Sequence, residues 1–126
     1  MRFFKLLFLV LLISTGCDRD PFETISTANL RGEYVGTFER NGETANVELQ
    51  FNNRQYTGSS EVQKFPAICK GEYTLKSNVI VFSNICPWTA EFDWTLILDG
   101  EWSYDLSGDT LILIAANGDK YNLTKK

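Results

Sequence analysis

Residues 32–51 read GEYVGTFERNGETANVELQF, and this stretch decides the fold. Two runs in which every second residue is apolar or small flank Asn41-Gly42. Successive side chains of a strand point to opposite faces, so a period of two predicts strands with one apolar face. Asn-Gly between two such runs is the strongest short signal for a hairpin. The apolar face is expected to carry Tyr34, Gly36 and Phe38 before the turn and Ala45, Val47, Leu49 and Phe51 after it.

The same pattern recurs to the end of the chain, with turn residues at short intervals. Further strands are expected at about 55–60, 68–75, 79–83, 92–98, 101–106, 110–115 and 119–124. Turns are expected at residues 76–78, 99–100, 107–108 and 117–118. Residues 61–66 are expected to form a longer loop. Residues 84–91 are expected to be irregular, with Cys86 pinned back to Cys69, and residues 22–30 to form at most one short helix or turn.

Eight or nine strands joined in sequence predict an all-β fold, an up-and-down antiparallel β-barrel of about eight strands. A flat sheet would leave two open edges that promote aggregation, and closure into a barrel removes them. A two-sheet sandwich is the alternative. It usually needs connections that cross between sheets, whereas these links are short.

The N-terminal residues have the layout of a secretory signal peptide. Arg2 and Lys5 precede an apolar core, and Ser14-Thr15-Gly16 ends the leader. The apolar core is shorter than the roughly 20 residues that span a bilayer. Domain boundaries are therefore predicted at 1–16 for the signal peptide, 17–30 for a tether and short N-terminal segment, and 31–126 for the barrel.

A small residue directly before Cys17 resembles the lipobox of bacterial lipoproteins, although Ser14 stands where leucine is usual. That resemblance implies cleavage before Cys17 and attachment of fatty acyl chains such as palmitate. Two or three chains would anchor the protein firmly to a membrane. The expected location is the bacterial cell envelope, at the outer membrane rather than the inner one, with the membrane face left open. An ordinary secreted protein is the alternative.

Cys69 and Cys86 remain as an even pair in an exported chain, which favours a disulfide. A metal site is the alternative, but two thiolates need further ligands and the neighbouring residues supply none. We therefore expect neither a metal nor a cofactor.

Composition excludes several classes of function. The chain contains no histidine, which rules out His-based acid-base catalysis and His-ligated zinc. Without residues 1–16, 10 basic residues face 16 acidic ones, a net charge of about −6. This charge disfavours nucleic acid and anionic lipid head groups as partners. The carboxylates of the last hairpins are expected on a solvated face, so we predict no enzyme.

Gly32-Glu33-Tyr34 at the start of the first strand, preceded by a short non-strand segment, resembles the G-x-W motif of lipocalins, with tyrosine in place of tryptophan. Residues 100–125, GEWSYDLSGDTLILIAANGDKYNLTK, look like the last three strands of small lipocalin-like bacterial lipoproteins. The resemblance implies a lipocalin-like calyx and brings no catalytic residue with it.

The interior of a small barrel holds either side chains or a ligand. The residues expected to face inward are mostly aromatic, with Gly36 and Gly71 as the only gaps: Tyr34, Phe38, Phe51, Tyr73, Phe92, Trp94, Trp102, Tyr104 and Tyr121. Six of them are candidate ligand-binding residues: Tyr34, Phe38, Tyr73, Trp94, Trp102 and Tyr104.

Two functions compete for this anchored, monomeric domain. The first is a carrier that binds a small apolar ligand inside the barrel. The second is a protein-protein interaction module, such as an inhibitor of an envelope hydrolase, that acts through loops around residues 64–66 and 87–88. A mainly structural lipoprotein has no positive feature to support it. An apolar void of roughly 300 Å³ or more would favour the carrier, and a filled interior would favour the loops.

Overall fold

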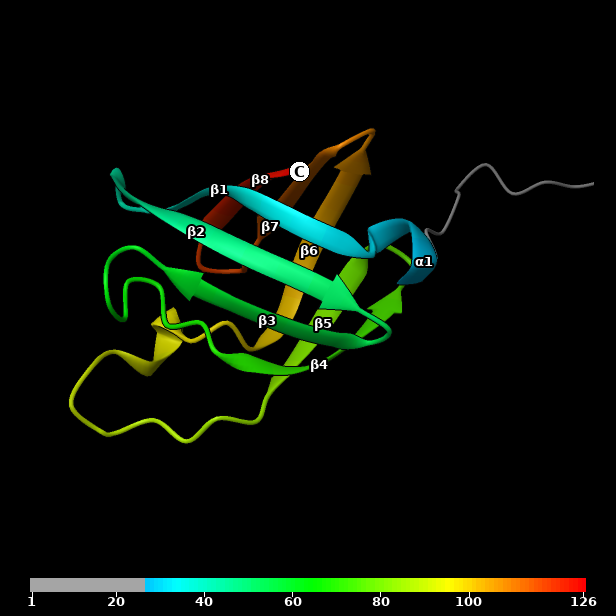
Figure 1. The fold of residues 1–126 in the computed structure, drawn as a ribbon. Helices are drawn as coiled ribbons and strands as arrows, with labels where there is room; N and C mark the ends of the chain where they lie inside the picture. Colours follow the sequence, from blue (N-terminus) through cyan, green and yellow to red (C-terminus); the bar gives the residue numbers. More distant parts are fainter. Residues whose placement is uncertain (1–26) are drawn as a thin grey trace, which may run out of the picture.

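Eight strands follow one another around a closed barrel in the computed structural model, which describes residues 27–126 (Figure 1). Each strand pairs antiparallel with the next in sequence, and β8 closes the barrel against β1. The elements are α1 (Thr27–Leu30), β1 (Gly32–Arg40), β2 (Glu43–Asn52), β3 (Gln55–Ser60), β4 (Lys70–Lys76), β5 (Val79–Asn84), the 3-10 helix η2 (Trp94–Leu96), β6 (Gly100–Ser107), β7 (Thr110–Ile114) and β8 (Lys120–Lys125).

This architecture confirms the predicted all-β, eight-stranded up-and-down barrel. The predicted leader, Cys17 and most of the tether lie outside the described residues. Among residues 27–126, no helix is long and apolar enough to cross a membrane.

The hairpin between β1 and β2 forms at the predicted turn. Arg40 pairs with Glu43, and Asn41 and Gly42 both have positive φ, as a two-residue hairpin turn requires. Every second residue of β2 from Ala45 to Phe51 is buried, so the alternation in the sequence does mark the inner face.

Later turns follow the prediction less closely. Ser77-Asn78 and Gly108-Asp109 are tight two-residue links, because Lys76 pairs with Val79 and Ser107 with Thr110. Asn117-Gly118 lies inside a five-residue connection, residues 115–119, and not in a two-residue hairpin.

The strand predicted at 92–98 is wrong, and so is the turn at Asp99-Gly100. β5 pairs directly with β6, which leaves residues 85–99 outside the sheet. We call this segment the strap. The Asp93 side chain accepts the backbone N–H of Thr95 and begins η2, which breaks the extended conformation that alternation had indicated.

Two glycines allow neighbouring strands to approach closely. A Cβ atom at Gly36 would collide with the carbonyl oxygen of Asn122 in β8, and one at Gly71 with that of Ser83 in β5. Glycine inside a strand often marks such a close backbone approach. The two predicted gaps in the inner face are therefore places where the barrel wall closes on itself, not room for a ligand.

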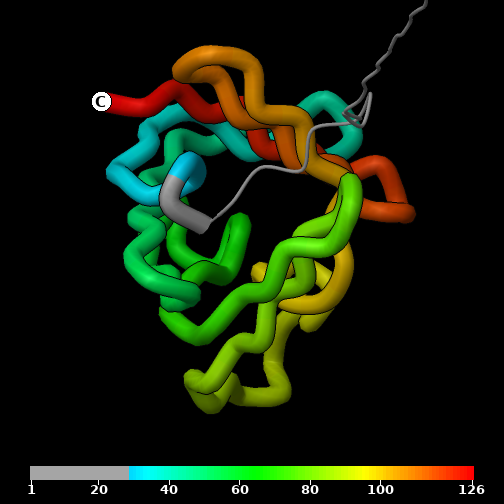
Figure 2. Tube along the Cα trace, turned by 90° about the vertical axis from the view of Figure 1, so that its right-hand side faces the viewer, coloured from blue at the N-terminus to red at the C-terminus, as the bar shows by residue number. Residues whose placement is uncertain are grey.

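The barrel has two unlike ends. One end carries α1, the links 53–54, 77–78 and 108–109, and the C-terminus, and we call it the tether end. The other, the loop end, carries the link 41–42, the loop 61–69, the strap and the connection 115–119. Figure 1 shows α1 at one end and the yellow-green strap at the other. In Figure 2 the strands form a ring, with α1 beside its near opening.

Candidate functional site

The barrel interior is filled by aromatic side chains in contact with one another. Phe51 packs edge to face against Tyr34 and Tyr73, with ring centroids 5.6 and 5.2 Å apart. Tyr121 packs against Phe38 at 5.1 Å and Trp102 at 5.2 Å. Such pairs add stability beyond the apolar area that they bury.

Both ends of this interior are closed. Leu30 of α1 is fully buried at the tether end and its carbonyl oxygen accepts the Tyr34 hydroxyl at 2.8 Å. At the loop end Phe65 packs edge to face on Phe38 at 5.4 Å. Leu98 of the strap is also buried there, and its carbonyl oxygen accepts the hydroxyl of buried Tyr56 at 3.0 Å.

Five of the six candidate ligand-binding residues belong to this packed interior or border it. Tyr34, Phe38, Tyr73 and Trp102 are buried core residues. Tyr104 is half-buried and packs against the core, with its hydroxyl 3.4 Å from the carbonyl oxygen of Ser77.

The predicted inward position of Trp94 is wrong, since 54% of the residue is exposed. Trp94 and Phe92 belong to the strap and not to a strand, so their alternation does not point them inward. Two buried aromatic residues that sequence alternation did not single out are Tyr56 in β3 and Phe82 in β5, whose rings lie 5.0 Å apart.

Burial governs the chemistry of the interior tyrosines. Removal from water disfavours the charged phenolate, which raises the pKa of Tyr34 to about 12, with smaller contributions from Tyr73 and Asp109. Burial also raises the pKa of Tyr121 well above its usual value. Among the described residues, the hydroxyls of Tyr73 and Tyr121 have no hydrogen-bond partner.

Three hollows on the described part of the chain lie outside the core. Two of them, of 320 and 460 Å³, cover the outer side of β1, β2 and β3, where the lining is mostly backbone and short polar or acidic side chains. The third, of 420 Å³, lies at the strap and is lined by Asn84, Cys86, Pro87, Trp88, Trp94, Ile97 and Asp99. Only this third hollow is lined by tryptophans.

The strap is fixed at its start by the disulfide between Cys86 and Cys69, which the cysteine pair had predicted. Asn84 reinforces this attachment. Its side-chain amide donates to the carbonyl oxygen of Cys86 at 2.8 Å, and its carbonyl oxygen lies 3.3 Å from both the Cys86 backbone nitrogen and Trp88 Nε1.

At its end, the strap is fixed to the loop 61–69. Ala67 donates its N–H to the carbonyl oxygen of Leu96 at 2.9 Å and accepts the N–H of Leu98 at 3.0 Å. Ala67 and Ile97 form a parallel bridge between the two segments. The strap is therefore a second layer on the loop end.

An ion-pair network fixes the middle of the strap to the barrel. Arg40, at the end of β1, forms two hydrogen bonds with buried Asp119, at 2.8 and 2.6 Å. The same guanidinium donates to Asp93 at 3.1 Å and to the Thr95 hydroxyl at 2.9 Å. Hydrogen bonds from Thr95, together with Arg40, hold the pKa of Asp93 below its usual range.

Sequence reasoning missed this network because its members lie 53 and 79 residues from Arg40 along the chain. An arginine directly before an Asn-Gly turn could be noticed, but nothing in the sequence indicates its partners. Only barrel closure brings the end of β1 beside the connection 115–119.

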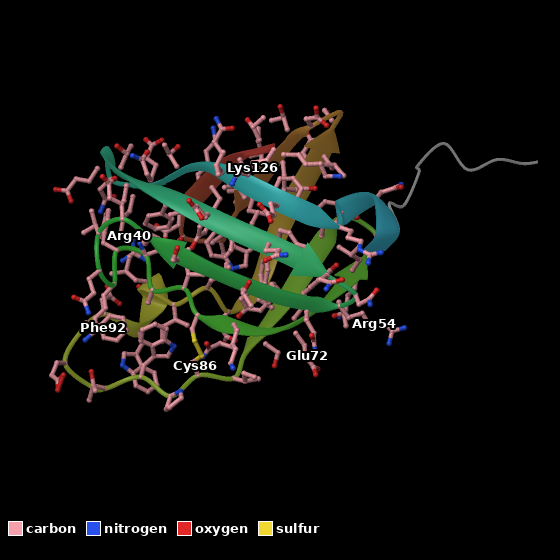
Figure 3. All side chains as sticks on the ribbon, in the orientation of Figure 1. Arg40, Arg54, Glu72, Cys86, Phe92 and Lys126 are labelled. Atoms are coloured by element: carbon pink, nitrogen blue, oxygen red, sulfur yellow. A yellow bond between two sulfur atoms is a disulfide. The ribbon has the colours of Figure 1, made fainter. Side chains whose placement is uncertain are left out.

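The strap is attached at its start, middle and end, yet it presents apolar groups to solvent. Ile85 is 63% exposed, in addition to Trp94. Trp88 packs against Phe92 at 5.7 Å, and the Lys64 ammonium lies 5.0 Å from the centre of the Phe92 ring. In Figure 3, Phe92 lies at the opposite side of the molecule from Arg54 at the tether end, and Cys86 lies between them on the lower edge. The exposed apolar side chains and the 420 Å³ hollow form the candidate functional surface, the strap surface.

The described residues limit the chemistry of this surface. Within residues 27–126, no three His, Cys, Asp or Glu side chains lie together so that they could hold a metal ion. A scan against models of protein families and searches of characterised proteins and solved structures find no match to this chain. The function must therefore be argued from the strap surface itself.

Proposed function

We propose that this chain is a lipid-anchored lipoprotein of the bacterial cell envelope whose barrel acts as a monomeric protein-protein interaction module, without catalytic activity of its own. The strap surface makes the contact. An envelope hydrolase is the kind of partner that such a module would inhibit.

The observation that supports this proposal is the exposure of apolar side chains on a strap that is held to the barrel at several points. Ile85 and Trp94 are exposed on a segment that is tied down by a disulfide, a bridge to Ala67 and the Arg40 network. Exposed apolar surface marks interaction sites when it is extensive, and the strap carries two exposed apolar side chains and a hollow lined by tryptophans. A segment that is already ordered loses little conformational freedom on binding, and tryptophan is enriched among residues that dominate interface energies.

The interior gives the carrier hypothesis less support. The three hollows named above lie outside the core, and aromatic side chains on the inner face contact one another. A small apolar ligand would have to displace these rings. The carrier stays a prediction that a binding assay can test.

The position of the proposed anchor agrees with this use of the strap. Ten peptide steps from Cys17 to Thr27 span at most about 35 Å. The chain enters the barrel at the tether end, and the strap lies at the loop end (Figure 1). An anchor on Cys17 would hold the tether end near the lipid and leave the strap surface accessible to a partner.

The anchor is tested by Cys17→Ala in the full-length chain. We expect the wild-type protein to partition into the detergent phase and the variant into the aqueous phase, because the acyl chains supply the membrane affinity. A variant that still enters the detergent phase would contradict the proposed anchor.

The interaction surface is tested by photo-cross-linking in the host cell. A photoreactive side chain at Ile85 should give one discrete protein adduct, because this residue is 63% exposed on the strap. The matched control carries the same group at Asp105, which is exposed on β6. Equal adducts from both positions, or none from Ile85, would contradict the strap surface as the contact.

A further inference from the structure

The hollow at the strap offers aromatic faces to a ligand. Trp88 and Trp94 both line it, together with Pro87 and the disulfide-bonded Cys86. The Nε1 of Trp94 donates to the carbonyl oxygen of Thr89 at 2.7 Å, and that of Trp88 lies 3.3 Å from Asn84 Oδ1. Because both indole N–H groups already have partners, in Thr89 of the strap and Asn84 of β5, the indoles present chiefly their rings.

The hollow also has a negative charge and no positive one. Asp99 is its only ionisable lining residue. One carboxylate oxygen of Asp99 accepts the backbone N–H of Asn84 at 2.8 Å, which fixes the carboxylate at the edge of the hollow. Within the described residues, its other oxygen has no hydrogen-bond partner.

This combination of groups suits a cation. The faces of tryptophan rings attract ammonium and guanidinium groups, and a carboxylate adds a charged acceptor. Phe92 of the strap already makes one such contact, with the ammonium of Lys64 in the loop 61–69. Glu91 and Glu101 add exposed negative charge on the strap and at the start of β6.

We infer that the hollow between Trp88, Trp94 and Asp99 receives an arginine or lysine side chain of a basic partner protein. This inference rests on the proposed function. The partner's cationic group lies against the indole rings and pairs with the Asp99 carboxylate.

A glycan fits these groups less well. Sugar hydroxyls need hydrogen-bond donors as well as acceptors in the site. Nearly all hydrogen-bond donors of the hollow are already paired within the protein. Both indole N–H groups and one amide hydrogen of Asn84 are used in hydrogen bonds among residues 84–94, and the lining contains no serine, threonine, lysine or arginine. What is left is a carboxylate oxygen and ring faces, which match a cation.

The test is an NMR titration of the full-length protein in detergent micelles with N-acetylarginine amide. We expect saturable shifts of the Trp88 and Trp94 indole signals, with the backbone amide of buried Tyr121 as the unmoved reference. N-acetylcitrulline amide, which has nearly the same shape without the charge, should cause no shift. Asp99→Asn should weaken arginine binding about three- to tenfold, since the variant keeps an acceptor for Asn84 but loses the charge. Asp105→Asn is the matched control and should bind like the wild type.

Each other outcome overturns the inference. Equal binding of the citrulline compound, or no effect of Asp99→Asn, would mean that charge is not recognised. Shifts with tri-N-acetylglucosamine and none with the arginine compound would identify a glycan site. The proposed function is judged separately by cross-linking at Ile85. An adduct without arginine binding refutes only the cation pocket, whereas arginine binding without an adduct refutes the proposed partner protein.

Discussion

The barrel interior and the strap both use aromatic side chains, and the two regions differ in what surrounds the rings. Inside, Tyr121 is fully buried between Phe38 and Trp102, so its ring only packs within the core and cannot contact a partner. On the strap, Trp94 is tied down through its N–H to Thr89 while more than half of the residue stays exposed. The same residue class therefore stabilises the fold in one region and is available for recognition in the other.

The largest expected difference between the regions is in stability. Trp102→Ala should lower the free energy of unfolding by about 3–5 kcal/mol, because it opens a cavity in the core. Trp94→Ala should change it by less than about 1 kcal/mol, because the ring is mostly in water. Urea unfolding of the two variants measures both values. Equal losses would show that the strap tryptophan is part of the core.

The disulfide is expected to matter mainly to the strap. Replacing both Cys69 and Cys86 with alanine removes a cross-link over a separation of 17 residues, at a cost of about 3 kcal/mol. Hydrogen exchange should quicken most at the amides of residues 85–99, while β1 and β2 stay protected. Unchanged protection of the strap would mean that its hydrogen bonds hold it without the cross-link.

Alkaline pH should weaken the interior and spare the strap. The pKa of Tyr34 is raised to about 12 in the folded state, against about 10 when unfolded. As pH rises, Tyr34 loses its proton in the unfolded state before it does so in the folded state. The contribution of Tyr34 to the free energy of unfolding is therefore complete below pH 10 and is lost as pH rises to 12. Screening by solvent reduces the effect, so Tyr34 should lower the free energy of unfolding by at most about 2 kcal/mol over that interval.

The control for this effect is Tyr34→Phe. It should be less stable than the wild type at pH 8 by about 1 kcal/mol, because Leu30 loses a hydrogen bond. Its stability should then fall less steeply between pH 10 and 12 in urea unfolding. A parallel fall in both proteins would show that Tyr34 is not responsible.

The smallest effect is expected from two hydroxyls within the interior. Tyr56→Phe should cost about 1 kcal/mol because the bond to Leu98, and with it a link to the strap, is lost. Tyr121→Phe should be neutral or slightly stabilising, since its hydroxyl has no partner among the described residues. Thermal unfolding of the Tyr56→Phe and Tyr121→Phe variants measures both changes in stability. A clear loss in Tyr121→Phe would reveal a hidden partner.

The sequence predicts the barrel well because its main signals are local. Alternation in β2 and the Asn41-Gly42 turn report burial and chain reversal within a few residues. Eight strands with short links then leave closure as the simplest way to remove open edges.

The strap could not be predicted because its conformation depends on distant contacts. Phe92, Trp94 and Leu96 alternate as a strand would, but Arg40 and Ala67 hold this segment outside the sheet. The disulfide was predicted, yet a cysteine pair does not say which rings will face solvent. For that reason Trp94 was expected inside the barrel and lies on its surface.

Native mass spectrometry of the full-length protein, purified in detergent from its own host, tests the central claim most directly. The claim is that binding takes place on the strap and not in the interior. We predict a bound species of protein size that is lost from a Trp94→Ala variant and kept by Asp105→Asn. A small apolar molecule retained equally by the wild type and by Trp94→Ala would contradict the claim and restore the barrel interior as the binding site.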